Sequence, residues 1–410
     1  FNLDFTEDLN FSGLLGATAR RLDFRQMRSS TTGGLVIPGL YALSNSVNLL
    51  TPPTEAVTEL HTNGYFASAS FGYRNMLYLD LTGRFDEASS LPEEDNTYFY
   101  PSASTSFVFS ELVEGDWLTF GKFSANYAEV GNYAPALSVN NTYFSQTNFT
   151  TPLYSVNSTA NNPNLKSETT KSVELGLEMD FVQNRFGINV SAYKTNSVDQ
   201  LMPVTITAAT GYSQQWVNAG EIENKGIELG AHLTPVQTED FQWMINANWY
   251  KNESEVLSLY GQNQNLQLAS MQGGVSINAT VGQPYGMIWG TNFTFDDNGN
   301  RIIHPETGRF VVDATPQPIG KMTPDWKAGI SNNFRYKDLS FSFLIDIQEG
   351  GNVFSLDTWY GYATGVPANT VGTNDLGNPM RNPLSEGGGI VLEGVNPDGS
   401  VNTTRTDMST

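Results

Sequence analysis

The sequence predicts an all-β fold, an up-and-down antiparallel barrel that spans a membrane, and three observations lead to this prediction. Apolar and polar residues alternate over many short segments, as in strands with one polar, water-exposed face and one apolar face. Short and long connections alternate along the chain. Aromatic residues gather beside the short connections, which is typical of the interfacial girdle of a membrane barrel.

The clearest strand pair covers residues 170–190. Over residues 173–181 every odd position is apolar, and the even positions include Glu174 and Glu178. After a short polar turn the alternation resumes at Phe186. Period-two alternation on both sides of a minimal turn predicts a β-hairpin.

The same pattern recurs along the chain and predicts about 12 strands over residues 1–410. We expect tight turns at 7–8, 74–75, 114–116, 183–185, 239–240 and 337–338. We expect long loops chiefly at 26–58, 133–168, 260–324 and 353–410. In a meander, all tight turns then lie at one end and all long loops at the other, as in outer-membrane barrels. The aromatic residues at the tight-turn end are Tyr73, Trp117, Phe181, Phe186, Phe241, Trp243, Phe334, Tyr336 and Phe341.

The alternation also predicts which side chains face lipid and which face the lumen. The expected lipid-facing residues are Val173, Leu175, Leu177, Ile188, Val190, Leu229, Ile245 and Phe343. The expected lumen-facing residues are Glu174, Glu178, Asn189, Glu228 and Asn246. In the loop segment DDNGN we expect a type I′ turn at Asn298 and Gly299, in which both residues have positive φ.

Composition excludes several classes of protein. The chain has no cysteine, so disulfides, zinc fingers and thiol catalysis are excluded. Its 42 acidic residues against 21 basic ones give a formal charge of -21, which argues against a nucleic-acid partner. No apolar run approaches the ~20 residues of a transmembrane helix. A soluble β-sandwich or propeller would also show alternating apolar and polar residues. Two features favour the membrane barrel: the long loops all lie at one end of the strands, and the polar face is rich in Gly, Ser and Asn.

Several segments resemble one known family. Residues 162–172 (NPNLKSETTKS) are similar to a segment of TonB-dependent outer-membrane transporters, although Ser167 stands where that family usually has Pro. Residues 209–229 (ATGYSQQWVNAGEIENKGIEL) resemble the SusC/RagA branch found in Bacteroidetes. The further segments that resemble this branch are residues 71–92, 98–112 and 341–354. The resemblance covers essentially the whole chain.

The resemblance implies a fold and a function. Barrels of this family have about 22 strands around a plug, so we expect the chain to be an inner portion of such a barrel, without the plug. It implies TonB-dependent active import of an oligosaccharide or peptide through the outer membrane of a Gram-negative bacterium. The implied partners are outer-membrane lipid, a SusD-like surface lipoprotein above the long loops, and the TonB-ExbB-ExbD complex acting through the plug. The alternative is a non-transporting β-rich surface protein that binds glycan or mediates adhesion.

The sequence shows no sign of catalysis. It contains no G-x-S-x-G, H-E-x-x-H or phosphate-loop spacing, and the three histidines, His61, His232 and His304, are far apart. We therefore expect no catalytic residue, no metal site and no cofactor. The acidic residues Glu174, Glu178 and Glu228 fall on polar strand faces. They indicate either a cation or substrate site in the lumen or, as we favour, hydration of a water-filled lumen.

Aromatic residues in the loops are the better candidates for substrate binding. They are Tyr143, Tyr154, Tyr212, Trp216, Tyr285, Trp289 and Trp359. Aromatic rings beside amides can stack on sugar rings or peptide side chains while the amides bind their polar edges. The competing interpretation is packing between loops or against a partner, and for any single residue we favour it.

Overall fold

The computed structural model describes residues 1–146, 151 and 153–408. The chain forms two compact units. Unit 1 consists of Phe1–Asn252, Leu257–Gln262 and Ala328–Ile345, and unit 2 of Glu253–Val256, Asn263–Lys327 and Asp346–Thr410. No helix within the described residues is both long enough and apolar enough to cross a bilayer.

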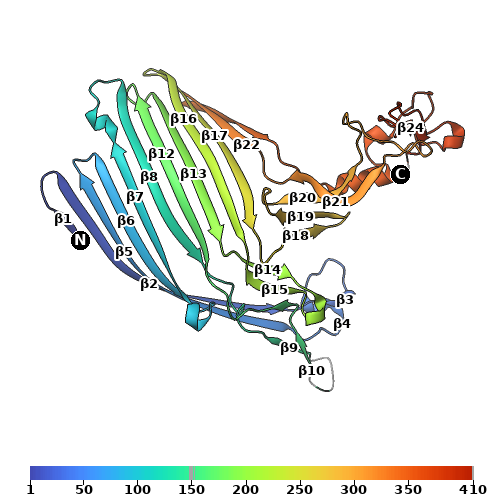
Figure 1. The fold of residues 1–410 in the computed structure, drawn as a ribbon, viewed down its shortest axis with the longest axis horizontal. Coiled ribbons are helices and arrows are strands. Elements are labelled where there is room, and N and C mark those ends of the chain that lie inside the picture. The colour runs from blue at the N-terminus through green and yellow to red at the C-terminus, as the bar shows by residue number, and fades with distance from the viewer. Residues whose placement is uncertain (147–150, 152, 409–410) are drawn as a thin grey trace. The chain divides into compact units, whose positions relative to one another are not determined.

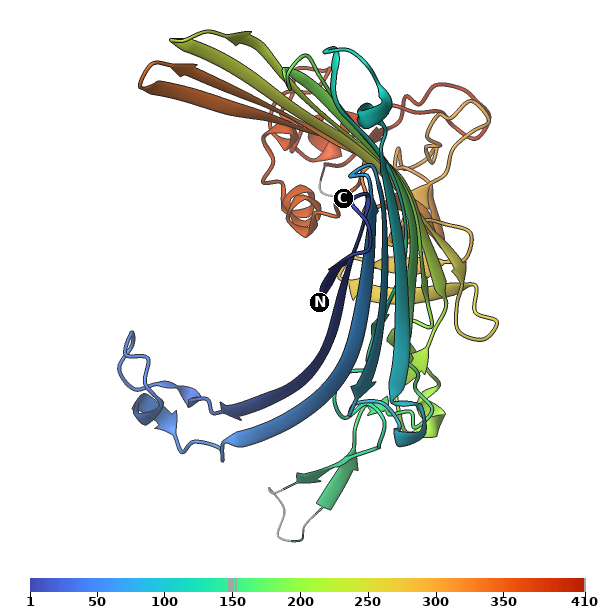
Figure 2. The same cartoon turned by 90° about the vertical axis from the view of Figure 1, so that its left-hand side faces the viewer.

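The principal sheet has 12 strands, and its neighbours follow chain order (Figure 1). In sheet order the strands are β1 (Asn2–Asp4), β2 (Leu9–Arg28), β5 (Thr54–Tyr73), β6 (Leu77–Ala88), β7 (Thr97–Val108), β8 (Leu118–Asn132), β12 (Glu168–Phe181), β13 (Phe186–Val198), β16 (Glu221–Gln237), β17 (Phe241–Ser258), β22 (Trp326–Tyr336) and β23 (Leu339–Glu349). This arrangement is the predicted up-and-down antiparallel meander. The strands of unit 1 form a curved wall (Figure 2).

The strand register separates a polar face from an apolar face. Cross-strand partners lie on the same side of a sheet, so each row of partners reports one face. One row across β8, β12, β13 and β16 reads Lys122, Glu178, Asn189 and Gly230. The neighbouring row reads Phe123, Leu177, Val190 and Leu229. We call these two sides the polar face and the apolar face.

Tight turns join the hairpins at one end of the sheet. Between β5 and β6, Arg74 and Asn75 both have positive φ, 52° and 54°. The N–H of Met76 donates to the carbonyl of Tyr73 at 3.0 Å and closes the turn. This is the type I′ geometry, whose twist matches that of the flanking strands.

Aromatic rings lie on the apolar face beside these turns. The ring of Phe181 stacks on Trp117 and on Phe186, with centroids 6.0 Å and 5.5 Å apart. Trp243 stacks on Phe334 at 5.5 Å. Part of the predicted aromatic cluster therefore packs into two groups of rings.

Long connections leave the other ends of the unit 1 strands and fold into small elements. These are β3 (Thr32–Leu35), η1 (Leu43–Asn45), β4 (Ser46–Asn48), η2 (Glu93–Asp95), β9 (Tyr143–Gln146), β10 (Leu153–Val156), β11 (Thr159–Ala160), β14 (Leu201–Thr205), η4 (Ala208–Thr210) and β15 (Gln214–Asn218). A further turn, η3 (Phe109–Leu112), precedes β8 at the tight-turn end. The first long connection covers 29–53 instead of 26–58, because β2 and β5 are longer than their alternation indicated.

Unit 2 contains a separate four-stranded sheet and small helical turns. The sheet consists of β18 (Asn265–Met271), β19 (Val275–Thr280), β20 (Met287–Phe293) and β21 (Val312–Lys321). The other elements are α1 (Leu356–Thr364), η5 (Ala368–Thr370), η6 (Leu384–Glu386) and the pair β24 (Ile390–Val391) and β25 (Arg405–Thr406).

The predicted type I′ turn at Asn298 and Gly299 is wrong. Gly299 has a φ of 81°, but Asn298 does not adopt a positive φ. The Asp296 carboxylate accepts the N–H groups of Asn298 and Asn300 at 2.9 Å and 2.7 Å. These side-chain hydrogen bonds hold a longer turn in which only the glycine has positive φ.

Candidate functional site

The polar face of β8, β12, β13 and β16 carries the acidic residues singled out from the sequence. Glu178 pairs with Asn189 and Glu174 with Tyr193 across β12 and β13. Glu228 on β16 pairs with Ser191, which lies in the row between the other two. The three carboxylates therefore share one face with amide and hydroxyl groups.

Two of the acidic residues on this face have basic partners. The Lys122 ammonium lies 2.8 Å from the Glu178 carboxylate. The Nε2 atom of His232 lies 3.5 Å from Oδ1 of Asp180. Both pairs are partly exposed, so the wall stays polar at these positions. The described residues contain no group of three or more His, Cys, Asp or Glu that could hold a metal ion.

A polar depression of about 340 Å³ lies over these strands. Its polar lining residues are Glu178, Asp180, Asn189, His232, Asn246 and Asn248. Carboxylates accept hydrogen bonds, and amides both donate and accept them. The depression can therefore bind hydroxyl groups or peptide amides.

A second depression, of about 420 Å³, lies on β6, β7 and β8. Here Arg84 Nε donates to Asp86 at 2.9 Å, and the Tyr100 hydroxyl donates to the same carboxylate at 3.3 Å. Arg84 also donates to Thr18 Oγ1 at 3.0 Å. A Cβ at Gly64 would lie 2.3 Å from Asp86 Oδ1, so this glycine makes room for the cluster.

This cluster is not among the residues predicted from the sequence. Arg84 and Asp86 are two residues apart on one strand, and this spacing alone places both on the same face. Tyr100 joins them because it pairs with Arg84 across β6 and β7. That register can be assigned only once the strands are paired.

The β9–β10 hairpin brings two of the predicted binding aromatics together. Tyr143 pairs with Val156, and Tyr154 pairs with Ser145. Alternation then places both tyrosines on one face of the hairpin, as diagonal neighbours within reach of each other. Their exposed fractions are 66% and 68%, so both rings are open to solvent. Phe144 lies on the opposite face.

Trp216 and Tyr212 take less accessible positions. The Trp216 ring packs against the buried residues Ala88, Leu91, Ala134 and Leu165. Tyr212 is half-buried after the η4 turn. Trp216 thus contributes to the packing at the base of the long connections.

The 162–172 segment has a structural role in this packing. Leu165 is fully buried. The Asn218 side chain accepts from the Lys166 N–H and donates to the Lys166 carbonyl, both at 2.9 Å. The Glu168 carboxylate accepts the Leu201 N–H at 3.1 Å. The segment therefore ties the 133–167 connection to the connection between β13 and β16.

The remaining three candidate aromatics lie in unit 2. Tyr285 is half-buried, and burial raises the pKa of its phenol. Trp289 in β20 is also half-buried. Trp359 in α1 is 50% exposed and packs edge-on against Tyr360 with centroids 4.9 Å apart. Trp359 is therefore the most accessible of the three.

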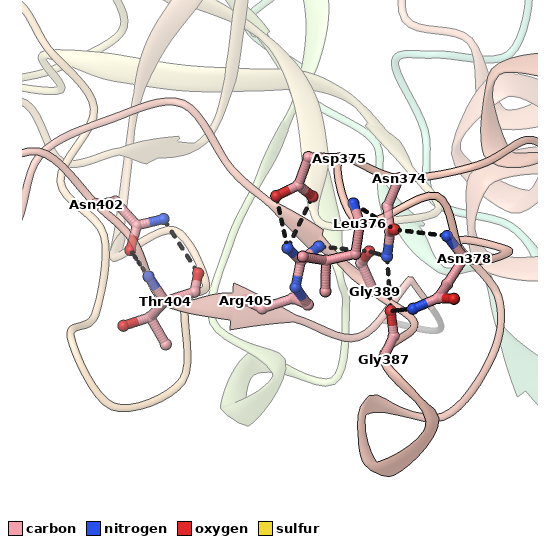
Figure 3. A network of polar contacts seen from close by, with 9 residues as sticks. All are labelled: Asn374, Asp375, Leu376, Asn378, Gly387, Gly389, Asn402, Thr404 and Arg405. Atoms are coloured by element: carbon pink, nitrogen blue, oxygen red, sulfur yellow. Dashed lines mark hydrogen bonds and ion pairs between the residues drawn. The ribbon is translucent and has the colours of Figure 1, made fainter.

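A polar network organises the last part of unit 2 (Figure 3). The Asn374 amide donates to the carbonyls of Gly387 and Gly389 at 2.8 Å and 3.0 Å. Arg405 donates to Asp375 at 2.8 Å and to the Gly389 carbonyl at 3.2 Å. The hydrogen bond from Arg405 lowers the pKa of Asp375 below its ordinary value. These contacts fix the segment that surrounds β24 and β25.

The sequence profile described as "TonB dependent receptor-like, beta-barrel" matches residues 1–383. The chain belongs to the TonB-dependent receptor β-barrel family. Its members lie in the outer membrane, and the predicted resemblance to SusC and RagA is confirmed.

Relatives of this TonB-dependent receptor chain include two curated proteins. The TonB-dependent receptor P26 of Formosa agariphila is 29% identical over 348 residues, covering 78% of this chain and 35% of that protein. The TonB-dependent receptor SusC of Bacteroides thetaiotaomicron is 26% identical over 305 residues, covering 68% of this chain and 30% of that protein. The chain thus spans about a third of the length of these relatives.

A solved structure shares the fold of this TonB-dependent receptor chain. The RagAB peptide transporter superposes with a TM-score of 0.73 at 20% identity. The match covers 84% of this chain and 40% of the other.

Proposed function

We propose that the protein forms part of the wall of a SusC-type, TonB-dependent importer for a large nutrient. One observation carries the proposal: a curved antiparallel sheet presents a continuous polar face opposite an apolar one. In a membrane barrel the apolar face contacts lipid and the polar face lines the lumen. The carboxylates Glu174, Glu178 and Glu228 would then keep the lumen wall hydrated.

The cargo in this proposal is an oligosaccharide or a peptide. Both classes present polar groups that the amide-rich depression beside Glu178 can hydrogen-bond. The exposed Tyr143 and Tyr154 on one hairpin face offer rings for stacking on a sugar or a side chain. The proposal includes no catalytic step.

The partners follow from the proposed import. Active uptake would require the TonB-ExbB-ExbD complex, acting through a plug inside the barrel. A SusD-like surface lipoprotein would hold the cargo above the long connections. Similarity to SusC supports this assignment, and so does the fold shared with a structure described as the RagAB peptide transporter.

Uptake by living cells tests the proposal. Fluorescent oligosaccharides and peptides of similar size are offered to cells that produce the protein, with and without a functional tonB gene. We expect one of the two cargo classes to accumulate in the periplasm only when TonB is present. Surface binding that is unaffected by TonB, with no accumulation of either class, would instead support a non-transporting adhesin.

The two hairpin tyrosines supply the variant for this experiment. The double substitution Tyr143→Ala and Tyr154→Ala should weaken cargo binding by the ~1–3 kcal/mol typical of a lost hydrophobic or aromatic contact. The control is Phe144→Ala, which removes an exposed ring from the opposite face of the same hairpin. Equal effects of the two variants would count against a binding role for the tyrosine pair.

A further inference from the structure

The depression on β6, β7 and β8 lies close to the long connections. β6 ends at Ala88, two residues beyond Asp86, and β7 begins at Thr97, three residues before Tyr100. The volume of about 420 Å³ lies within the ~300–1,000 Å³ typical of small-molecule sites. In the proposed importer the long connections lie outside the cell. The depression would then lie near the end of the barrel at which cargo enters.

The strand register places this depression on the polar face. Tyr100 lies two residues from Ser102, and Ser102 pairs with Ala128 on β8. Ala128 is an even number of positions from Lys122, which belongs to the polar face, so these side chains share one side. Arg84 pairs with Tyr100 across β6 and β7 and therefore lies on the same side. The depression would face the lumen in the proposed importer.

The two charges in the depression compensate each other. Arg84 Nε donates to Asp86 Oδ2 at 2.9 Å and lies 2.8 Å from Oδ1. The Arg84 side chain is 40% exposed and the Asp86 side chain 15%, so a ligand meets the pair rather than one isolated charge. The guanidinium also lies over the ring of Phe66, 5.5 Å from its centroid. A charged ligand would be repelled by one member of the pair, and the site therefore favours an uncharged ligand.

Hydrogen-bond donors and acceptors lie side by side in this depression. Oδ1 of Asp86 accepts no aligned hydrogen bond within the part of the chain that the structure describes. The guanidinium of Arg84 beside it carries further N–H donors. Thr82 Oγ1 and Ser102 Oγ form a second such pair, 2.5 Å apart. Neighbouring hydroxyl groups of a sugar each donate and accept, so they match paired donors and acceptors better than a peptide does, whose N–H only donates and whose C=O only accepts.

An aromatic ring and apolar side chains complete the lining. Tyr100 is half-buried, and Pro101 and Val130 lie beside it in the depression. The Tyr100 ring packs against Tyr98 with centroids 4.9 Å apart. A Cβ at Gly131 would overlap the Tyr100 ring, so this glycine lets the ring lie against β8. The depression thus combines an aromatic surface, on which the C–H face of a sugar ring can pack, with polar groups for its hydroxyls.

We propose that this depression binds one ring of an uncharged oligosaccharide. Tyr100 packs against the sugar ring, and Arg84 and Asp86 bind adjacent hydroxyl groups. The inference rests on the proposed function and deepens it, because it selects an oligosaccharide over a peptide and an uncharged oligosaccharide over an acidic one. Arg84 and Asp86 then act together as a selectivity element, since each cancels the charge of the other.

Calorimetric titration of the protein, purified from outer membranes in detergent, tests this inference. The uncharged probes are the hexasaccharides of the malto, cello, manno and galacto series. Hexagalacturonate is the acidic probe, and a hexapeptide of glycine and asparagine with blocked ends is the peptide probe. We expect at least one uncharged hexasaccharide to bind about tenfold or more tightly than either of the other two probes.

Variants separate sugar binding from a structural role of these residues. Tyr100→Ala should weaken binding of the uncharged probe about tenfold, through the lost aromatic contact. The control is Tyr78→Ala, which removes a half-buried tyrosine from the polar face of β6 outside the depression and should leave the affinity unchanged. Asp86→Asn leaves Arg84 without its compensating charge, so this variant should bind the uncharged probe less tightly and hexagalacturonate more tightly. A merely structural role of Asp86 would not exchange the two affinities in this way.

Three results would overturn the proposal. The first is that none of the uncharged hexasaccharides binds, and the second is that hexagalacturonate or the peptide binds equally well to the unmodified protein. The third is an unchanged order of affinities in an assembled Asp86→Asn variant, which is measured even if Tyr100→Ala does not assemble. The titration does not involve TonB. Sugar binding as predicted without uptake by cells would therefore contradict the proposed import alone, whereas TonB-dependent uptake without this binding would contradict only the assigned site.

Discussion

Neighbouring side chains on one strand lie on opposite faces of the sheet in this protein. On β12, Leu177 pairs with Phe123 and Val190, all on the apolar face. The next residue, Glu178, pairs with Lys122 and Asn189 on the polar face. A charge is costly only where hydrocarbon replaces water around it. The loss of stability caused by introducing a charge should therefore alternate from one residue to the next along the strand.

Leu177→Arg should destabilise the assembled barrel by ~2–4 kcal/mol, because it places a cation in the lipid-facing band. Glu178→Gln should cost under ~1 kcal/mol, because the partly exposed pair with Lys122 contributes little. The free energy of unfolding is measured by urea titration in lipid vesicles. A tolerated arginine combined with a damaging glutamine would show that the two faces are exchanged.

The pair of Asp375 and Arg405 predicts a pH effect in unit 2. The hydrogen bond from Arg405 lowers the folded pKa of Asp375 below the ~3.9 of an unfolded aspartate. Its stabilising contribution is therefore present above the unfolded pKa and is lost as pH falls through the folded pKa. We expect cleavage by pepsin within residues 374–405 to rise over this acidic range. The Asp375→Asn variant should lose the part of the pH dependence of cleavage that the pair of Asp375 and Arg405 causes. A cleavage profile identical to that of the unmodified protein would contradict this role of the pair.

The sequence shows which aromatic residues lie in the loops, but it does not show how exposed each side chain is. Tyr143 and Trp216 were chosen for the same reason, as aromatic residues in polar loops. Tyr143 is open to solvent, whereas Trp216 packs against a buried cluster. The difference depends on packing against a cluster that includes Ala88 and Leu165, which are distant in sequence and which no local pattern brings together.

At the scale of elements, hairpins whose two faces differ in polarity were predicted well. The β12–β13 hairpin alternates over its whole length, and the structure confirms it. The 20-residue strands β2 and β5 were recognised only in part. Beyond Tyr65 both faces of β5 carry polar residues, for example Asn63 and Thr62. Where a strand leaves the hydrocarbon, the period-two signal disappears although the hydrogen bonds continue.

The tight turn between β5 and β6 predicts a local effect on stability. Arg74 and Asn75 both require positive φ, which asparagine and glycine tolerate better than β-branched residues. Asn75→Val should cost ~1–2 kcal/mol, the strain of a bulky residue in the left-handed region. Asn75→Gly should be neutral or stabilising. Both are compared by urea titration in vesicles, and equal stability of the two variants would contradict the assigned turn.

At the scale of the whole molecule, the edges of the principal sheet limit what the chain can do alone. Among the described residues, β1 and β23 each pair on one side only. An unpaired backbone polar group in hydrocarbon costs several kcal/mol, so membrane sheets close into barrels. The 410-residue chain produced alone in detergent-free buffer should therefore aggregate, as seen by size-exclusion chromatography. A monodisperse, protease-resistant monomer would contradict a membrane wall.

The central claim is that one face of this sheet contacts lipid and the other contacts water. The chain has no cysteine, so single cysteines placed in turn at residues 173–181 can each carry a spin label in the assembled protein. Collision with lipid-soluble oxygen and with a water-soluble nickel complex is then measured at each position. We predict that odd positions collide more with oxygen and even positions more with nickel, with a period of two. A uniform profile, or one with the phase reversed, would contradict the claim.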